Sequence, residues 1–262
     1  MSEDSWLRTA IGGATADAIT VRDRDLATEL MGRVTFTELA FLLVAGRQPA
    51  PEDTRLLDAV LVSLADHGLT PTVLAARLTY TGAPESLQGA VAAGLLGAGS
   101  VFLGVVEDTA TLLGDIAGPA GDDDAALASA AGEAVRALLA GGRRVPGLGH
   151  PVHKLEDPRT PRIYSIAEEC GRLGVHLRLL RHVAAAHARE TGRTLPINGA
   201  GVAGAALADL GFAPAIVRGF ALLARTAGLV GHLAEERASP LGMRLYAEVD
   251  RRAGAPRRPA DP

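Results

Sequence analysis

The residues best suited to chemistry lie in one run, Arg143–Arg162, which reads RRVPGLGHPVHKLEDPRTPR. Gly147 and Gly149 allow main-chain N–H and C=O groups to approach a ligand where a Cβ would clash. His150 can donate or accept a proton near neutral pH. Three basic side chains add positive charge nearby: Lys154, Arg159 and Arg162. The run predicts a site for an anionic, oxygen-rich substrate, and a surface turn with ordinary solvated basic residues is the alternative interpretation.

A second histidine, His67, lies in the turn DHGLTP, where a predicted helix ends. Gly68 and Pro71 fix the course of this turn. A surface histidine at a helix C-terminus, where a cation is mildly favoured, is the alternative to a functional role. Further along the chain, LPINGAG over residues 195–201 is a tight, glycine-rich approach to another helix.

Helices must position these side chains, because apolar residues recur at helical spacing along most of the chain. The helix that ends near Gly46 has Thr35 or Thr37 as its N-cap, and the basic side chains over residues 177–190, including His187, are interpreted as a solvated face. For the helix that ends near Gly46, the helical spacing extends over residues 26–43. The other predicted helices cover residues 51–64, 72–81, 85–96, 125–140, 161–173, 177–190, 202–210 and 214–238, with an exposed loop over residues 118–124.

The composition favours an all-α protein. Of the 262 residues, 48% are hydrophobic and only 3% are aromatic, and there are 31 glycines. The interior must therefore be built from Ala, Leu and Val, which pack helices closely, whereas a β-sandwich or barrel draws more on β-branched and aromatic residues. The length allows one domain, or one large domain with a smaller one.

The net charge and the cysteine content limit which partners and which cellular compartment are expected for the protein. The net charge of −4 gives no broad basic surface for nucleic acid or an acidic membrane. A single cysteine, Cys170, excludes an intramolecular disulfide framework and a cysteine-rich metal site, so a cytoplasmic location and no metal are expected. The N-terminal residues MSED have neither the basic nor the apolar region of a signal peptide.

Four segments, taken in order, resemble the citrate synthase superfamily, and within it citryl-CoA lyase-type members and the lyase module of ATP-citrate lyase. They are ADHG at residues 65–68, VPGLGH at 145–150 followed by DPR at 157–159, PINGAG at 196–201, and ARTAGLVGH at 224–232. The resemblance implies an all-α, citrate synthase-like fold and a homodimer. It also implies a site for a CoA thioester and a polycarboxylate between two helical domains.

The expected large domain comprises residues 1–117 and 211–250, and the small domain, which carries the substrate loop, comprises residues 118–210. Residues 251–262 are rich in Arg, Pro and Ala and are expected to form a disordered tail.

The resemblance also implies roles for individual residues. His150 looks like the histidine that exchanges a proton with the carbonyl or hydroxyl oxygen of the oxyacid, and His67 like the one that polarises the thioester carbonyl and stabilises its enolate. Arg159 and Arg225 resemble the arginines that clamp substrate carboxylates, and Asn198 is placed with them as substrate-binding. The residues expected to receive CoA, a substrate and not a bound cofactor, are Arg143, Arg144, Val145, Gly147, Leu148, Gly149 and Lys154.

The chain departs from the family pattern at positions that matter for catalysis. The pattern Asn-Val-Asp-Gly, whose aspartate takes the α-proton of the acyl-CoA, is Asn-Gly-Ala-Gly here, with Ala200 at the aspartate's place. Loss of a positioned general base costs about 10²–10⁴-fold in rate. The family's arginine after the motif histidine is Pro151, and an arginine that the partner subunit contributes falls near Leu241, beside Arg244. Three residues are candidates to replace the missing base: Asp66, Glu107 and His153.

Three functions remain open from the sequence. The first is an enzyme of the citrate synthase or citryl-CoA lyase type that makes or breaks a C–C bond of an acyl-CoA or oxyacid substrate, with altered chemistry. The second is a repurposed biosynthetic enzyme that performs a cyclisation, hydrolysis or condensation on a substrate without CoA. The third is a dimeric binding protein without catalysis. Both histidines and both arginines are present, which favours an enzyme.

Overall fold

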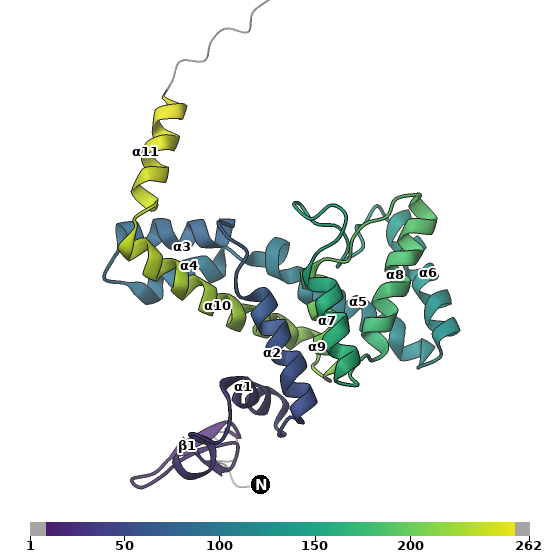
Figure 1. Cartoon of the computed structure of the whole chain (residues 1–262), viewed down its shortest axis with the longest axis horizontal. Helices are drawn as coiled ribbons and strands as arrows, with labels where there is room; N and C mark the ends of the chain where they lie inside the picture. The colour runs from purple at the N-terminus through teal and green to yellow at the C-terminus, as the bar shows by residue number, and fades with distance from the viewer. Residues whose placement is uncertain (1–8, 255–262) are drawn as a thin grey trace, which may run out of the picture.

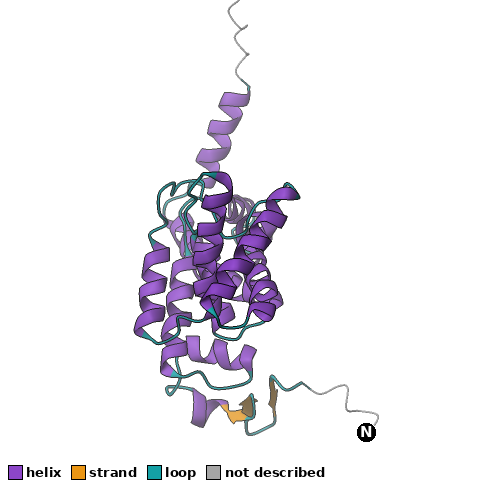
Figure 2. Ribbon diagram, turned by 90° about the vertical axis from the view of Figure 1, so that its right-hand side faces the viewer, coloured by secondary structure: helices purple, strands orange, loops and turns teal. Residues whose placement is uncertain are grey.

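Alanine, leucine and glycine dominate the apolar residues, and the chain folds almost entirely into helices, as the composition predicts (Figure 2). The computed structural model describes residues 9–254. The helices are α1 (Phe36–Ala45), α2 (Pro51–Ala65), α3 (Pro71–Gly82), α4 (Leu87–Leu96), α5 (Gly104–Ala120), α6 (Asp124–Ala140), α7 (Arg159–Glu169), α8 (Val175–Thr191), α9 (Gly199–Asp209), α10 (Pro214–Ala238) and α11 (Gly242–Ala253). Two single π-helical turns, η2 (Leu26–Leu30) and η3 (Gly99–Leu103), precede α1 and α5.

Local capping chemistry explains where several helices begin. The Thr35 hydroxyl accepts the N–H of Glu38 at 3.2 Å, and the Glu38 carboxylate accepts the N–H of Thr35 at 2.6 Å, which is a capping box. Pro51, Pro71 and Pro214 occupy the first positions of α2, α3 and α10, where the missing N–H costs nothing. The predicted helices over these segments are confirmed, and Thr35 is the N-cap.

Other predicted boundaries are wrong. The predicted exposed loop over residues 118–124 is confined to residues 121–123, because α5 continues through Pro119 to Ala120 and α6 begins at Asp124. The helix predicted over residues 161–173 begins at Arg159, since the side chain and the carbonyl of Asp157 accept the first N–H groups of α7. The predicted disordered tail from residue 251 starts inside α11, where Glu248 pairs with Arg251 and Arg252. Residues 255–262 of that tail lie outside the described residues.

A small antiparallel sheet precedes the helices, with β1 (Gly12–Ala14), β2 (Ile19–Val21) and β3 (Arg24–Asp25) in that order. The turn between β2 and β3 places Arg22 and Asp23 at φ values of 47° and 62°. The Arg22 guanidinium donates to the carbonyl of Leu43 in α1, which ties the sheet to the helical body. The sheet lies at the opposite end of the molecule from α11 (Figure 1).

The buried apolar residues form two clusters, and α10 contributes to both. Figure 1 shows α10 running from α3 and α4 towards α9. The larger cluster includes residues of α2, α5 to α9 and the first half of α10. The smaller one contains Val73 of α3, Ala90 of α4, and Leu229 and Leu233 of α10. Because the larger cluster spans both expected domain boundaries, at residues 118 and 211, the two-domain division stays a prediction.

Helix α10 is also the most apolar long helix of the described chain. It has 25 residues with a mean hydropathy of 1.2 over its apolar stretch, so its length and composition would allow it to cross a membrane. However, residues along its length pack into both apolar clusters, and it buries Arg225 and Glu236 within the protein. We therefore interpret α10 as a core helix.

Candidate active site

The loop between α6 and α7 carries His150 and is held by a short antiparallel contact with the segment that leads into α9. The N–H of Gly149 donates to the carbonyl of Pro196 at 2.7 Å, and the N–H of Asn198 donates to the carbonyl of Gly147 at 2.9 Å. Gly147 has a φ of +80°, and a Cβ there would lie 2.9 Å from Thr109 Oγ1. Glycine is therefore required by both the backbone conformation and the space.

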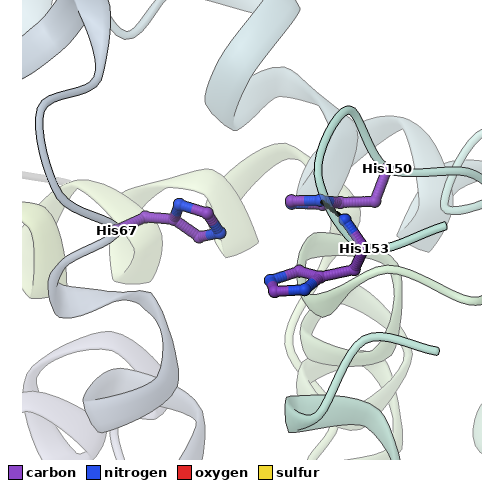
Figure 3. A group of neighbouring side chains, drawn as sticks. All are labelled: His67, His150 and His153. Atoms are coloured by element: carbon purple, nitrogen blue, oxygen red, sulfur yellow. Dashed lines mark hydrogen bonds between the residues drawn. The ribbon is translucent and has the colours of Figure 1, made fainter.

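Three histidines from two distant segments meet beside this loop (Figure 3). His67 follows the end of α2, and its ring centroid lies 5.2 Å from that of His150 and 5.7 Å from that of His153. The rings of His150 and His153 stack with their centroids 4.5 Å apart. All three side chains are half-buried. The structure thus brings together His67 and His150, and adds His153 to them.

The hydrogen bonds of His150 define which ring nitrogen carries the proton. Nδ1 accepts the main-chain N–H groups of Val152 at 3.1 Å and His153 at 3.0 Å. The neutral ring therefore carries its proton on Nε2. Burial lowers the pKa of His150, the carboxylate of Asp157 raises it, and the neighbouring histidines lower it further, so the net shift is downward. At neutral pH the ring is thus an uncharged donor through Nε2.

The same three histidines raise the question of a metal site, since one nitrogen from each lies within 4.8 Å of the others. A metal ligand must offer a lone pair, and its other nitrogen usually donates to an acceptor. In His150 the arrangement is reversed, because Nδ1 accepts N–H groups and Nε2 carries the proton. The cluster therefore fits hydrogen-bond donation to a substrate oxygen better than metal ligation.

Arg159 is already paired with a buried carboxylate. Its Nε donates to Asp157 Oδ1 at 2.9 Å and its Nη2 to Asp157 Oδ2 at 2.7 Å, and the N–H of Gly199 donates to Oδ2 at 2.8 Å. Burial raises the pKa of Asp157, but the hydrogen bonds and charge of Arg159 outweigh this and lower it to about 2. The pair adds no net charge to the site, and a contact of Arg159 with a substrate carboxylate stays a prediction.

Arg225, by contrast, has a buried Nε that makes no hydrogen bond to the described residues. The residue as a whole is 6% exposed. Burial lowers the pKa of Arg225, the charge of Asp66 raises it and the charge of Arg159 lowers it, which places Arg225 beside both ends of the site. A buried N–H donor without a partner is costly. We expect an anionic ligand to accept a hydrogen bond from Arg225 and so to offset this cost.

Asn198 and Ala200 mark the start of α9. The side-chain oxygen of Asn198 accepts the N–H of Gly201 at 2.8 Å, and its side-chain nitrogen donates to the carbonyl of Gly149 at 2.8 Å. Both ends of the amide thus hold the His150 loop to α9, and substrate binding by Asn198 stays a prediction. Ala200 is the second residue of α9, and its methyl group packs against the larger apolar cluster. No proton acceptor stands at that position.

The residues expected to receive CoA occupy different environments. The side chain of Val145 is buried in the core, while Lys154 is exposed and donates from Nζ to the carbonyl of His150 at 3.2 Å. Arg143 and Arg144 are exposed at the start of the loop. Leu148 forms the β-bridge with Ile197. The loop is thus well anchored, and its contact with CoA stays a prediction.

Sequence reasoning missed two features of the site. Asp157 was considered only as part of a motif, although its spacing before Arg159 is the signal for a local ion pair. His187, expected on a solvated face, is buried in α8 with 8% exposure, because that helix turns this position towards the core.

Two surface clefts lie away from the histidines, one of about 550 Å³ beside Tyr80 and Met243, and one of about 340 Å³ beside Thr37 and Asp58.

The helical fold, the paired histidines and the buried arginine define a protein of the citrate synthase-like class. The family model for the citrate synthase C-terminal domain matches residues 35–246, and the chain belongs to the citrate synthase family.

The sequence matches to known relatives cover only part of this chain and of each relative. The chain is 32% identical over 128 residues to the citrate synthase of Deinococcus radiodurans, a match that covers 48% of this chain and 31% of that protein. It is 30% identical over 127 residues to putative citrate synthase 2 of Mycobacterium bovis, covering 47% of this chain and 31% of that protein. The chain thus spans well under half of the length of these relatives.

Solved structures match nearly the whole chain. Citryl-CoA lyase from Hydrogenobacter thermophilus superposes with a TM-score of 0.83 and 29% identity, covering 97% of this chain and 95% of that chain. ATP citrate lyase from Methanothrix soehngenii, in complex with citrate and coenzyme A, superposes with a TM-score of 0.76 and 21% identity, covering 100% of this chain and 43% of that chain. The second likeness shows the fold alone.

Proposed function

We propose that this protein is an enzyme that makes or breaks a C–C bond between an acyl-CoA and an oxyacid, with chemistry altered by Ala200. The observation that carries the proposal is the buried guanidinium of Arg225, whose Nε has no partner among the described residues, close to Asp66 and Arg159. Such a group fits a substrate carboxylate, which a guanidinium binds through two parallel hydrogen bonds. The likeness to citryl-CoA lyase over nearly the full length supports the acyl-CoA part.

The geometry assigns a direction of proton movement in condensation. Nε2–H of His150 donates a hydrogen bond to the keto oxygen of the oxyacid and stabilises the alkoxide that forms there with the new C–C bond. The proton that the base removes from the acyl-CoA balances the step, because the alkoxide takes up one proton to become the hydroxyl. His67 donates to the thioester carbonyl oxygen, where negative charge develops in the enolate; such a donor contributes several kcal/mol, about 2.7–4 in measured cases. Cleavage reverses these steps: the hydroxyl loses its proton, Nε2–H of His150 stabilises the resulting alkoxide, and the enolate regains a proton from the base.

Enolate formation needs a base that Ala200 cannot supply. Among the three candidates, Asp66 is occupied by His232 and by the N–H of Gly68, and Glu107 forms an ion pair with Arg218 at 3.7 Å. His153 alone lies within the histidine cluster. We therefore assign the substitute base to His153, and His153→Gln should reduce turnover by about 10²-fold or more.

A second candidate function is a repurposed enzyme whose substrate carries no CoA. Two observations favour it: Ala200 removes the base that acts on acyl-CoA, and Asp157 already occupies Arg159. Tight CoA binding, measured by calorimetry, would count against this candidate. A ligand bound beside His150 with the loop over residues 145–149 left empty would favour it.

We further propose that the protein works as a homodimer in the cytoplasm. Large apolar side chains are exposed on η3 and on one face of α11: Val101, Phe102, Met243, Tyr246 and Val249. Helix α11 stands away from the helical body in both views (Figures 1 and 2). A second copy that covers this helix would bury that face. Light scattering should therefore give a mass of about twice the 26.9 kDa of the chain.

The proposed activity is tested by offering citryl-CoA, and separately acetyl-CoA with oxaloacetate, while free thiol and oxaloacetate are followed. Turnover should depend on His150 and His67, so His150→Ala and His67→Ala should each reduce it by about 10²-fold or more. His182→Ala is the matched control, because this histidine pairs with Asp124 away from the site. Turnover equal in wild type and His150→Ala would refute the proposal.

A further inference from the structure

A chain of polar side chains lies behind His67 and connects it to the interior of α10. His232 of α10 contacts Asp66 Oδ1 through Nε2 at 2.8 Å, and its Nδ1 contacts Nη2 of Arg77 at 2.9 Å. Nη1 of Arg77 pairs with Glu236 at 2.9 Å. Arg77 and Glu236 are each 3% exposed. The inner end of the chain is therefore a buried ion pair and its outer end is the residue next to His67.

The donors in this chain fix the protonation of His232. A guanidinium only donates, so Nδ1 of His232 accepts from Arg77. The proton of the neutral ring is then on Nε2, from which it is donated to Asp66. Burial raises the pKa of Asp66, but hydrogen bonds from the N–H of Gly68 and from His232 outweigh it, and the pKa lies below its usual value. Asp66 is therefore an ionised acceptor.

Asp66 in turn holds the main chain on the far side of His67. Its Oδ2 accepts the N–H of Gly68 at 2.8 Å, which closes a turn around His67, and Gly68 has a φ of +73°. On the near side, Gly228 of α10 packs directly on the carbonyl of Ala65, where a Cβ would overlap. The residue that carries the imidazole is thus fixed on both sides to α10.

We propose that His232 is a positioning residue that acts through Asp66 to hold His67 against His150 and His153. It does not itself lie in the histidine cluster. The importance of His232 for turnover rests on the function proposed above for His67. The effect of His232 on the position of His67 is independent of that function. Hydrogen-bond partners that orient metal-ligating histidines contribute about 10–100-fold to affinity or activity, and by analogy we expect a loss of about this size in kcat, with little change in KM.

Three variants separate positioning from general stability. His232→Leu removes both hydrogen bonds, and His232→Gln retains an acceptor for Arg77 and a donor for Asp66. His182→Leu is the matched control, because His182 also pairs with an aspartate, Asp124, at 3.1 Å on another part of the molecule. The readout is the ring resonances of His67 in NMR spectra, assigned by their absence in His67→Gln.

The expected result is that His232→Leu shifts the His67 resonances and lowers kcat, that His232→Gln restores both, and that His182→Leu changes neither. Unchanged His67 resonances in folded His232→Leu would overturn the proposal. If that variant does not fold, Asp66→Asn serves instead, since Asp66 is half-exposed and the amide removes its charge and one of its two acceptor oxygens; the same outcomes then apply. A shift of His67 without turnover in any variant would support positioning and contradict the proposed activity.

Discussion

Replacement of Arg225 by methionine should make the protein more stable and unable to bind its acid. In the ligand-free protein the buried Nε of Arg225 has no acceptor among the described residues. An unsatisfied buried donor costs about 1–3 kcal/mol. Methionine fills a similar volume without a polar group, so Arg225→Met should raise the free energy of unfolding by about 1–2 kcal/mol. For a chain of this size that is about 2–8 °C in Tm.

Binding should change in the opposite direction. A charge-assisted hydrogen bond contributes about 1.5–3 kcal/mol, so Arg225→Met should weaken carboxylate binding by about 10–100-fold or more. Calorimetry with oxaloacetate measures the binding, and thermal unfolding measures the stability.

Arg77→Met is the matched control, because Arg77 is similarly buried and its Nε also has no partner among the described residues, but its Nη1 pairs with the buried Glu236. Breaking this pair leaves an uncompensated carboxylate, which costs about 3–5 kcal/mol. The two substitutions should therefore have opposite signs in thermal unfolding. A lower Tm for Arg225→Met, together with unchanged ligand affinity, would refute the view that Arg225 is kept for a ligand.

Three further predictions follow from the loop and its neighbours. The pKa of Asp157 in the folded protein is about 2, below its usual value of 3.8, so the ionised carboxylate stabilises the fold above about pH 4 and this stabilisation is lost as the pH falls towards 2. The free energies of unfolding of wild type and Asp157→Asn should therefore differ by about 2 kcal/mol or more at pH 7. A difference that stays constant down to pH 2 would contradict this. The His150 ring should titrate below pH 6.5 by NMR, and lower still in Asp157→Asn, since the Asp157 charge raises the pKa of His150; a value above 6.5 would be inconsistent with a neutral donor. Gly147→Ala should lower the free energy of unfolding by about 1–3 kcal/mol, because a Cβ there meets Thr109 at positive φ. The control Gly142→Ala has a φ of +66° but open space around it, and should lower the free energy of unfolding by only about 1 kcal/mol. Equal losses in urea unfolding would show that the contact between residue 147 and Thr109 is unimportant.

Much of the helical fold could be predicted from local sequence signals. Pro51, Pro71 and Pro214 mark helix starts because the missing N–H and the fixed φ suit that position, and these helices begin where the prolines stand. The predicted helices do not include α11, although Met243, Tyr246 and Val249 recur at helical spacing on one face. That face is exposed, and charge pairs such as Glu248 with Arg251 stabilise the helix locally.

The residues of the site could be named from the sequence, but their partners could not. The motif segments identified His67 and His150, and the structure places their rings 5.2 Å apart. Which arginine is free depends on packing: Asp157 reaches Arg159 because α7 begins between them, while α10 carries Arg225 into the interior without an acid beside its Nε. The tautomer of His150 likewise follows from main-chain N–H groups whose direction no local pattern specifies.

The most direct test of the proposed chemistry is the rate of thiol and oxaloacetate release from citryl-CoA by wild type and by Ala200→Asp. The account predicts slow turnover in wild type, an increase of about 10²-fold or more when the carboxylate is restored at the start of α9, and loss of both rates in the His150→Ala background. No increase in Ala200→Asp, in a folded protein that binds CoA, would contradict the claim that the site is an acyl-CoA centre that lacks only the family's aspartate.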